Sequence, residues 1–296
     1  MYVAESRWSR GESSLEAGLY LVPGARLQTI VSRGLSMDAR FLAAAETPAD
    51  TVNLFLLHEG SVGLELPDSA TVAGCAPCWW VASRDEFELR RGPAASFSLR
   101  GEPRRSVEIC LAVDRLHVPP GLRHGLRASS PALTASVAAL FDRASSHRAQ
   151  RVDRCRDLFR ALSAAGICTL PTEPDEGAHE RSIQRILDSF DPLYQRHQTS
   201  AYAQLLAGLA GMSLRQTTRD VAAMTQLFRL PGNNLRELLR VLRLRRATML
   251  LSAPGLSLED VASEIGYGSL TALGRAFRDA GLPPPRDVRV ALQSPV

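Results

Sequence analysis

The chain has 296 residues, 45% of them hydrophobic, and its 35 basic and 31 acidic side chains leave a formal net charge of +4. This length allows two domains, and this apolar content is that of a folded protein, which excludes a chain disordered as a whole. No apolar run approaches the roughly 18 residues of a membrane-spanning helix and the first ten residues do not resemble an export signal, so we expect a cytoplasmic protein with no membrane partner.

Basic charge is concentrated at the C-terminal end of the chain. Residues 200–296 hold 12 arginines against 7 acidic residues, a net charge of +5, and the remainder carries −1. All 35 basic residues are arginines, which indicates a GC-rich genome before it indicates any chemistry. A basic region beside a near-neutral one is compatible with phosphate binding by one of two domains.

Residues from about 15 to 115 predict a β-rich domain. Apolar and polar residues alternate in Ser61–Leu66 and again in Val107–Val113, which puts one apolar face on each strand. Short apolar runs broken by turn residues lie between them, a pattern typical of a β-sandwich or barrel. Trp79 and Trp80 point to opposite faces of one strand, so we expect at most one in the interior, packed in the core rather than lining a ligand site.

Cysteine and histidine positions argue against a metal centre. Cys75 and Cys78 form the one pair with metal or redox spacing, with no second pair and no nearby histidine, and we interpret them as buried thiols in a strand hairpin. Five cysteines without an export signal make a disulfide framework improbable. His58 is the only histidine before His117, and no His-x-His pair exists. We therefore expect no metal and no cofactor.

The pattern becomes helical after the proline-rich turn at residues 119–121. Apolar residues form one helical stripe from Leu133 to Phe141 and another from Leu158 to Leu162, which indicates a connector or a dimerisation element. Leu170–Gly177, with two prolines and three acids, is interpreted as a linker. Beyond it the chain reads as helical almost to its end.

Residues 257–278 carry the pattern of a helix-turn-helix unit. Ala262 and Gly266 supply the small residue where two helices cross and the residue tolerant of positive φ in the turn. Ser257 with Asp260 predicts a capping box, and Ser269 predicts the cap of the second helix. That helix would bury Leu273 and Phe277. The candidate DNA-binding residues of this second unit, on its solvent side, are Ser269, Thr271, Ala272 and Arg275.

The same arrangement occurs 55 positions upstream. Ala207 and Gly211 have the same four-residue spacing, and Ser213 with Gln216 predicts a capping box opening the next helix. One such pair is close to noise in a chain rich in alanine and glycine, whereas two pairs followed by capped helices are not. The candidate DNA-binding residues of this first unit are Ser213, Arg215, Gln216, Thr218 and Arg219.

A helix over Asn234–Ser252 is predicted between the two units, with Asn234 as N-cap and Glu237 as its partner. About 19 residues make a rod of about 28 Å, close to the roughly 34 Å between successive major-groove faces. We expect packing or salt bridges, rather than DNA contact, from Arg243, Arg245 and Arg246.

At these residues the chain resembles the AraC/XylS family of bacterial transcription regulators. The residues that are similar to the family signature are Leu242–Leu251, Leu258–Tyr267, Leu273–Arg278, Pro285 and Arg289. The resemblance covers roughly residues 180–290 and implies two-groove binding near promoters, activation through RNA polymerase and, often, an effector-binding cupin-like β domain at the N-terminus.

The predicted fold class is therefore α+β, in three parts. Residues 1–130 form a β-sandwich or cupin-like effector or regulatory domain, and residues 131–176 a helical connector or dimerisation segment with its linker. Residues 177–296 form an all-α AraC-type DNA-binding domain with two helix-turn-helix units. The expected partners are double-stranded promoter DNA, RNA polymerase, a small-molecule effector with unknown ligand-binding residues, and a second copy of the chain.

The predicted function is that of a sequence-specific transcription regulator, an activator, which reads two adjacent major grooves. Arginine pairs bidentately with guanine and glutamine with adenine, so Arg215, Gln216 and Arg219 suit base reading. The second recognition helix is chemically bland, with Arg275 as a phosphate contact, so specificity should lie mainly in the first unit.

Two alternatives stay open. One is a metal-free cupin-like small-molecule-binding protein or enzyme with a helical appendage, and the other is a degenerate regulator that acts through protein contacts alone. The enzyme needs a catalytic constellation, and the sequence contains no nucleophile motif, no paired acids in an identifiable pocket and no phosphate loop. We therefore expect a non-enzyme.

Overall fold

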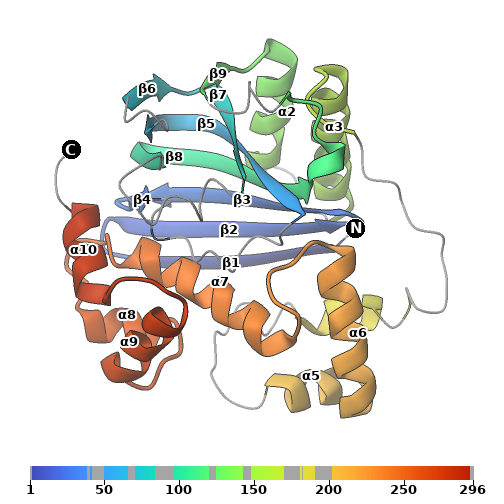
Figure 1. The fold of residues 1–296 in the computed structure, drawn as a ribbon, viewed down its shortest axis with the longest axis vertical. Helices are drawn as coiled ribbons and strands as arrows, with labels where there is room; N and C mark the ends of the chain where they lie inside the picture. The colour runs from blue at the N-terminus through green and yellow to red at the C-terminus, as the bar shows by residue number, and fades with distance from the viewer. Residues whose placement is uncertain are drawn as a thin grey trace.

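The chain folds as a β-sheet with helices on both faces (Figure 1). The computed structural model describes residues 2–38, 41, 50–65, 71–83, 97–119, 125–142, 148–169, 181, 183–190 and 202–293. The predicted α+β class, with a β domain followed by a helical domain, is confirmed, and the strands of the β domain are antiparallel. In these ranges no helix has both the length and the apolar character needed to cross a membrane. The predicted linker at residues 170–177 lies outside the described residues.

Within the described residues, nine antiparallel strands make one sheet, in the order β1-β2-β3-β8-β5-β7-β9, with β4 paired to β8 and β6 to β5. The strands are β1 (Tyr2–Arg10), β2 (Ser13–Val22), β3 (Ala25–Arg33), β4 (Met37–Asp38), β5 (Thr51–Glu65), β6 (Thr71–Cys75), β7 (Cys78–Ser83), β8 (Phe97–Ala112) and β9 (Arg127–Ala128). The predicted β region began too late, because β1 is rich in charged residues. Gly11, at φ 57°, makes the tight turn that pairs β1 with β2.

Both faces of the sheet are buried, which corrects the expectation for the two tryptophans. Trp80 is 1% exposed and stacks on Phe55 in the core shared with the C-terminal domain. Trp79 is 8% exposed and lies in the core beneath α2 (Pro131–Phe141) and α3 (Arg148–Ala164). The prediction that at most one tryptophan would be interior was wrong, because helices from two parts of the chain cover the two faces.

The Cys75–Cys78 interpretation was also wrong in part. Strands β6 and β7 both pair with β5 rather than with each other, so the two cysteines flank a break along one edge of β5. Cys78 is buried and Cys75 is exposed. Burial raises the pKa of the Cys78 thiol to about 11.

The predicted helical stripes before the C-terminal domain are confirmed. The apolar faces of α2 and α3 pack together on the sheet, with Leu133, Val137, Leu158 and Leu162 buried. Ser130 caps α2 by accepting a hydrogen bond from the Leu133 amide. The pair therefore shares the core of the β domain; the domain boundaries given above remain predictions.

Residues 183–190 are helical, and six further helices are described in the C-terminal domain. They are α5 (Tyr202–Ala210), α6 (Leu214–Leu227), α7 (Leu235–Leu250), α8 (Leu258–Glu264), α9 (Leu270–Asp279) and α10 (Pro285–Gln293). The linker helix α7 has 16 residues, shorter than predicted, and therefore spans about 24 Å. Asn234 caps it, and Glu237 accepts hydrogen bonds from the Asn233 amide and the Asn234 side chain.

The β domain buries the linker helix. The N-terminal half of α7 packs in a core with the first unit and with Leu19 and Leu21 of β2, and its C-terminal half joins the core shared with the second unit. Arg245 of α7 forms a buried ion pair with Glu108 of β8, and Arg26 of β3 lies 3.9 Å from the same carboxylate. The expected packing role of the linker arginines is confirmed, since Arg243, Arg245 and Arg246 are all buried.

Candidate nucleic-acid interface

The second helix-turn-helix unit consists of α8 and α9. Gly266 has φ 77°, and the Tyr267 amide donates to the Ala262 carbonyl at 2.8 Å, the Schellman hydrogen bond that ends a helix at a left-handed residue. The buried Ala262 packs in the core that also holds α9. Ser257 and Asp260 form the predicted capping box in both directions. Small residue, turn and caps therefore occur as the sequence predicts.

The first unit repeats this geometry in α5 and α6. Gly211 has φ 63°, and the Met212 amide donates to the Ala207 carbonyl at 2.9 Å, the counterpart of the bond in the second unit. Ser213 accepts from the Gln216 amide at 3.2 Å and so caps α6. The predicted capping box is only half present, because the Gln216 side chain turns to Asp220 instead of back to Ser213.

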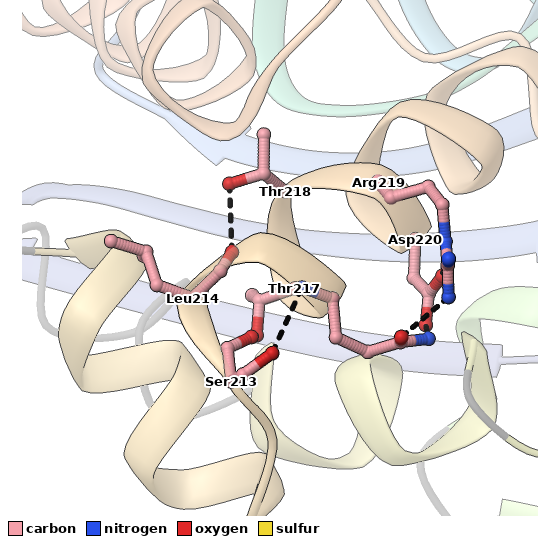
Figure 2. Close-up of polar contacts among 7 residues, drawn as sticks. Ser213, Leu214, Thr217, Thr218, Arg219 and Asp220 are labelled. Carbon is pink, nitrogen blue, oxygen red and sulfur yellow. Dashed lines mark hydrogen bonds and ion pairs between the residues drawn. The ribbon is translucent and has the colours of Figure 1, made fainter.

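The outward face of α6 carries two arginines in different states, of which Arg219 is drawn in Figure 2. Arg215 is exposed, and its guanidinium has no polar partner among the described residues. Arg219 donates through Nε to Oδ1 of Asp220 at 3.3 Å and through Nη2 to Oε1 of Gln216. Gln216 donates through Nε2 to Oδ2 of Asp220 at 2.6 Å, so both ends of its amide are engaged. Thr218 is exposed and donates to the Leu214 carbonyl at 2.9 Å.

This arrangement makes Asp220 the organising group of the α6 face. Its side chain is fully buried in the first unit, and its two carboxylate oxygens bind Arg219 and Gln216. Sequence reasoning did not single out Asp220, although an acid four residues after Gln216 on a helix is the spacing of such a contact. Arg219 is therefore held in place while most of its side chain, 66% exposed, faces solvent.

The outward face of α9 is plainer. Ser269 caps the helix by accepting from the Ala272 amide at 3.1 Å, and Ala272 itself is half-buried. Thr271 and Arg275 are exposed, as predicted, over the buried pair Leu273 and Phe277. Arg278 is also exposed and continues the stripe of Thr271 and Arg275, a position that the i, i+3 spacing from Arg275 could have revealed.

Residues 206–290, from α5 into α10, match the family model described as a helix-turn-helix domain. This segment is an AraC-type helix-turn-helix domain. The matched residues contain both glycine turns, both capped helices and the linker helix. The β domain lies outside the match.

No curated protein matches the chain. Among solved structures, the AraC-like transcriptional activator CuxR is similar at 12% identity, 81% coverage of this chain, 83% of that chain and a TM-score of 0.34. ToxT from Vibrio cholerae is similar at 11% identity, 90% and 99% coverage and a TM-score of 0.36. Ectoine synthase from P. lautus is similar at 12% identity, 35% and 67% coverage and a TM-score of 0.23. At these TM-scores the likenesses carry no argument about ligand or activity.

Charged side chains of α8, α10 and the β domain interact electrostatically near the end of β1. Arg289 of α10 is half-buried; burial lowers the pKa of its guanidinium, while Glu259 and Asp260 act in the opposite direction. Arg10, at the end of β1, forms an ion pair with Asp260 at 3.1 Å. The pKa of Asp260 falls to about 2, mainly because its carboxylate accepts from the Ser257 amide, with Arg10 as a further partner. The β domain thus touches the cap of the second unit.

Proposed function

We propose that this protein is a sequence-specific transcription regulator, an activator, whose helices α6 and α9 enter adjacent major grooves of promoter DNA. The observation that carries the proposal is the repeated turn. Gly211 and Gly266 both have positive φ, both turns have the same Schellman hydrogen bond, and each leads into a serine-capped helix with an exposed, arginine-bearing face. Catalysis does not call for such a repeat, whereas double groove binding does.

The length of α7 supports two-groove binding. The linker helix spans about 24 Å, and the two units lie at its opposite ends (Figure 1). Successive major-groove faces are roughly 34 Å apart. Because each unit extends beyond an end of α7, recognition helices spaced by about one turn of DNA are compatible with this rod.

The two faces suggest different roles. Arg215 is free to pair with a guanine, and Arg219 is pre-oriented by Asp220, which lowers the entropy lost when a side chain is fixed on a base. Gln216 serves to hold Arg219 rather than to read an adenine, since both ends of its amide are engaged. Thr271, Arg275 and Arg278 on α9 supply affinity through phosphates and methyl contacts. Specificity resides mainly in the first unit.

The test is equilibrium binding of the full chain to the duplex upstream of its own gene, with scrambled duplex as competitor. We expect Arg215→Ala and Arg219→Ala each to weaken specific binding about 5- to 150-fold, the equivalent of losing one base contact, and to relax specificity. Arg160→Ala is the matched control, since Arg160 is an exposed arginine on α3 of the β domain. Upstream duplex bound no better than scrambled duplex at moderate salt would overturn the proposal.

Salt dependence separates the contacts of the second unit. Arg275→Ala should weaken specific and scrambled duplex equally and reduce the slope of log affinity against log salt by about 1, as the loss of one phosphate contact does. A selective loss on the specific duplex alone would instead assign base reading to α9. Promoter output in cells that is unchanged by Arg215→Ala would favour a regulator acting through protein contacts only.

The remaining partners belong to the same proposal. In this proposal the protein acts in the cytoplasm, where it contacts RNA polymerase at the promoter. It also binds a small-molecule effector or a second copy of the chain. Transcription from the upstream promoter with purified polymerase tests activation: output that rises with added protein supports it, and output that falls indicates repression. Mass measurement of the protein on its duplex distinguishes one bound copy from two.

A further inference from the structure

A cavity of about 380 Å³ lies on the face of the sheet that carries α2 and α3. Its floor is formed by Gly18 and Tyr20 of β2 and by Thr29 of β3, and Phe141 at the end of α2 covers one side. This volume lies within the range of small-molecule sites. The cavity is separate from α6 and α9, so it takes no part in the DNA contacts proposed above.

The floor of the cavity is open because Gly18 has no side chain. A Cβ at this position would lie 2.6 Å from Oγ1 of Thr29 and 3.1 Å from Cε2 of Tyr20. Burial raises the pKa of Tyr20 to about 12, with a hydrogen bond to Thr29 acting in the opposite direction, so its hydroxyl stays neutral. The floor therefore offers two neutral hydroxyl groups beside bare backbone.

The walls carry charges of both signs in equal number. The acidic and basic residues that line the cavity are Glu5, Glu16, Asp142, Arg7, Arg105 and Arg151. Glu5 and Arg151 form an ion pair across the wall, with side chains 36% and 25% exposed, so water reaches both partners. An ion pair so hydrated opens at small cost when a ligand presents the matching charges.

We propose that this cavity binds a small zwitterion of amino-acid or dipeptide size, with its ammonium group on Glu5, its carboxylate on Arg151 and its polar substituents on the floor hydroxyls. A purely anionic or cationic ligand would satisfy one wall and leave the other side of the Glu5–Arg151 pair without a counter-charge. A neutral polyol has no charged group, so it could replace neither Glu5 nor Arg151 as the partner of the other. The ligand class follows from the equal numbers of acidic and basic residues in the cavity walls, and the ligand size follows from the cavity volume.

Strand β1 connects the cavity with the AraC-type domain, so the ligand would regulate it; this step rests on the proposed function. Among the strands that the structure describes, β1 lies at the edge of the sheet and pairs with β2 alone. Glu5 lines the cavity, whereas the neighbouring Ala4 faces the opposite side and packs in the core of the first unit. At its far end Arg10 forms the ion pair with Asp260 of the second unit. A ligand bound to Glu5 therefore acts on a strand that touches both units.

The site is tested by calorimetric titration of the full chain with the twenty L-amino acids and glycylglycine as probes. Three single-function probes serve as controls: acetate carries only a negative charge, ethylamine only a positive charge, and glycerol only hydroxyl groups. We expect at least one zwitterion to bind with a dissociation constant below 1 mM, and the single-function probes to bind at least tenfold more weakly. Absence of heat with every zwitterion at millimolar concentration, or equal binding of a single-function probe, would overturn the proposal.

Five variants, three at the site and two controls, locate the binding. Glu5→Gln and Arg151→Gln should each lower the affinity for the zwitterion at least tenfold. Arg160→Gln, at an exposed position on the same helix as Arg151, should leave the affinity unchanged. Gly18→Ala should block the floor, and Gly208→Ala is its control, since a Cβ there meets nothing within 4 Å. Glu5→Gln keeps the shape of a part-exposed side chain, so it tests the site even if Gly18→Ala fails to fold. Unchanged affinity in Glu5→Gln and Arg151→Gln would refute the assignment.

DNA binding is then measured with and without the zwitterion found. A change of at least threefold in affinity for the upstream duplex, lost in Glu5→Gln, supports regulation through β1. Zwitterion binding with unchanged DNA affinity overturns the regulatory step and leaves the ligand site in place. Zwitterion binding by a chain that shows no specific DNA binding overturns the proposed function alone, so the two failures are distinguishable.

Discussion

Glu108→Gln should strongly destabilise the junction between the two domains. The carboxylate of Glu108 forms an ion pair with Arg245 of the linker helix and lies close to Arg26 of the sheet, and in both pairs the side chains are only 5% exposed. Removing one partner of a buried pair leaves the other charge without compensation, at a cost of about 3–5 kcal/mol. Here two arginines lose the same partner, so we expect a loss in the upper part of that range.

The assay is urea unfolding followed by tryptophan fluorescence. The three tryptophans, Trp8, Trp79 and Trp80, all belong to the β domain, so the signal reports on the sheet that holds Glu108. Glu59→Gln is the matched control, because the Glu59–Arg105 pair is 35% and 38% exposed and should contribute only about 0–1 kcal/mol. Arg245→Met in the Glu108→Gln background should recover part of the loss, since an apolar side chain needs no counter-charge.

The pH dependence has a defined sign. Burial by itself would raise the pKa of Glu108, but Arg245 and then Arg26 outweigh it and the pKa is lowered from 4.5. The stabilisation is therefore fully present above pH 4.5 and is lost as the pH falls through the lower folded-state value. The reasoning would be refuted if Glu108→Gln cost no more than Glu59→Gln at pH 7, or if its cost did not shrink in acid.

Three further predictions concern single residues. Gly211→Ala should lower the free energy of unfolding by about 1–2 kcal/mol and weaken DNA binding, because a φ of 63° is strained for any residue with a Cβ. Gly208→Ala within α5 should instead raise the free energy of unfolding by about 0.5–1 kcal/mol. Thermal unfolding of the two variants checks that the first loses and the second gains stability. NMR titration should give the Asp260 carboxyl a pKa of about 2, and Arg10→Gln should raise this pKa. The contacts of Asp260 therefore stabilise the fold fully above pH 3.8, and this stabilisation is lost as the pH falls towards 2. A pKa that is unshifted from 3.8 would contradict the contacts with Ser257 and Arg10. Cys75 is the one exposed thiol of the five, so a thiol reagent should modify one group rapidly in the native protein, and Cys75→Ser should abolish that fast phase.

The sequence by itself determined the two helix-turn-helix units of the C-terminal domain. Their signals are local: a small residue, a glycine four positions later and a serine cap all act within one turn and its flanking helices. For that reason the turns at Gly211 and Gly266 and the caps at Ser257 and Ser269 lie where the pattern puts them. The α+β order was equally readable from the change of hydrophobic period.

Only the tertiary structure decided what covers each surface. The alternation that makes Trp79 and Trp80 point to opposite faces is local, but burial of both depends on helices from two distant parts of the chain. The Gln216 side chain hydrogen-bonds Asp220 and Arg219 because folding buries Asp220 beside it. Arg245 becomes an internal charge because the sheet places Glu108 against the linker helix. Contacts between residues distant in sequence depend on which faces meet, and no local period encodes that pairing.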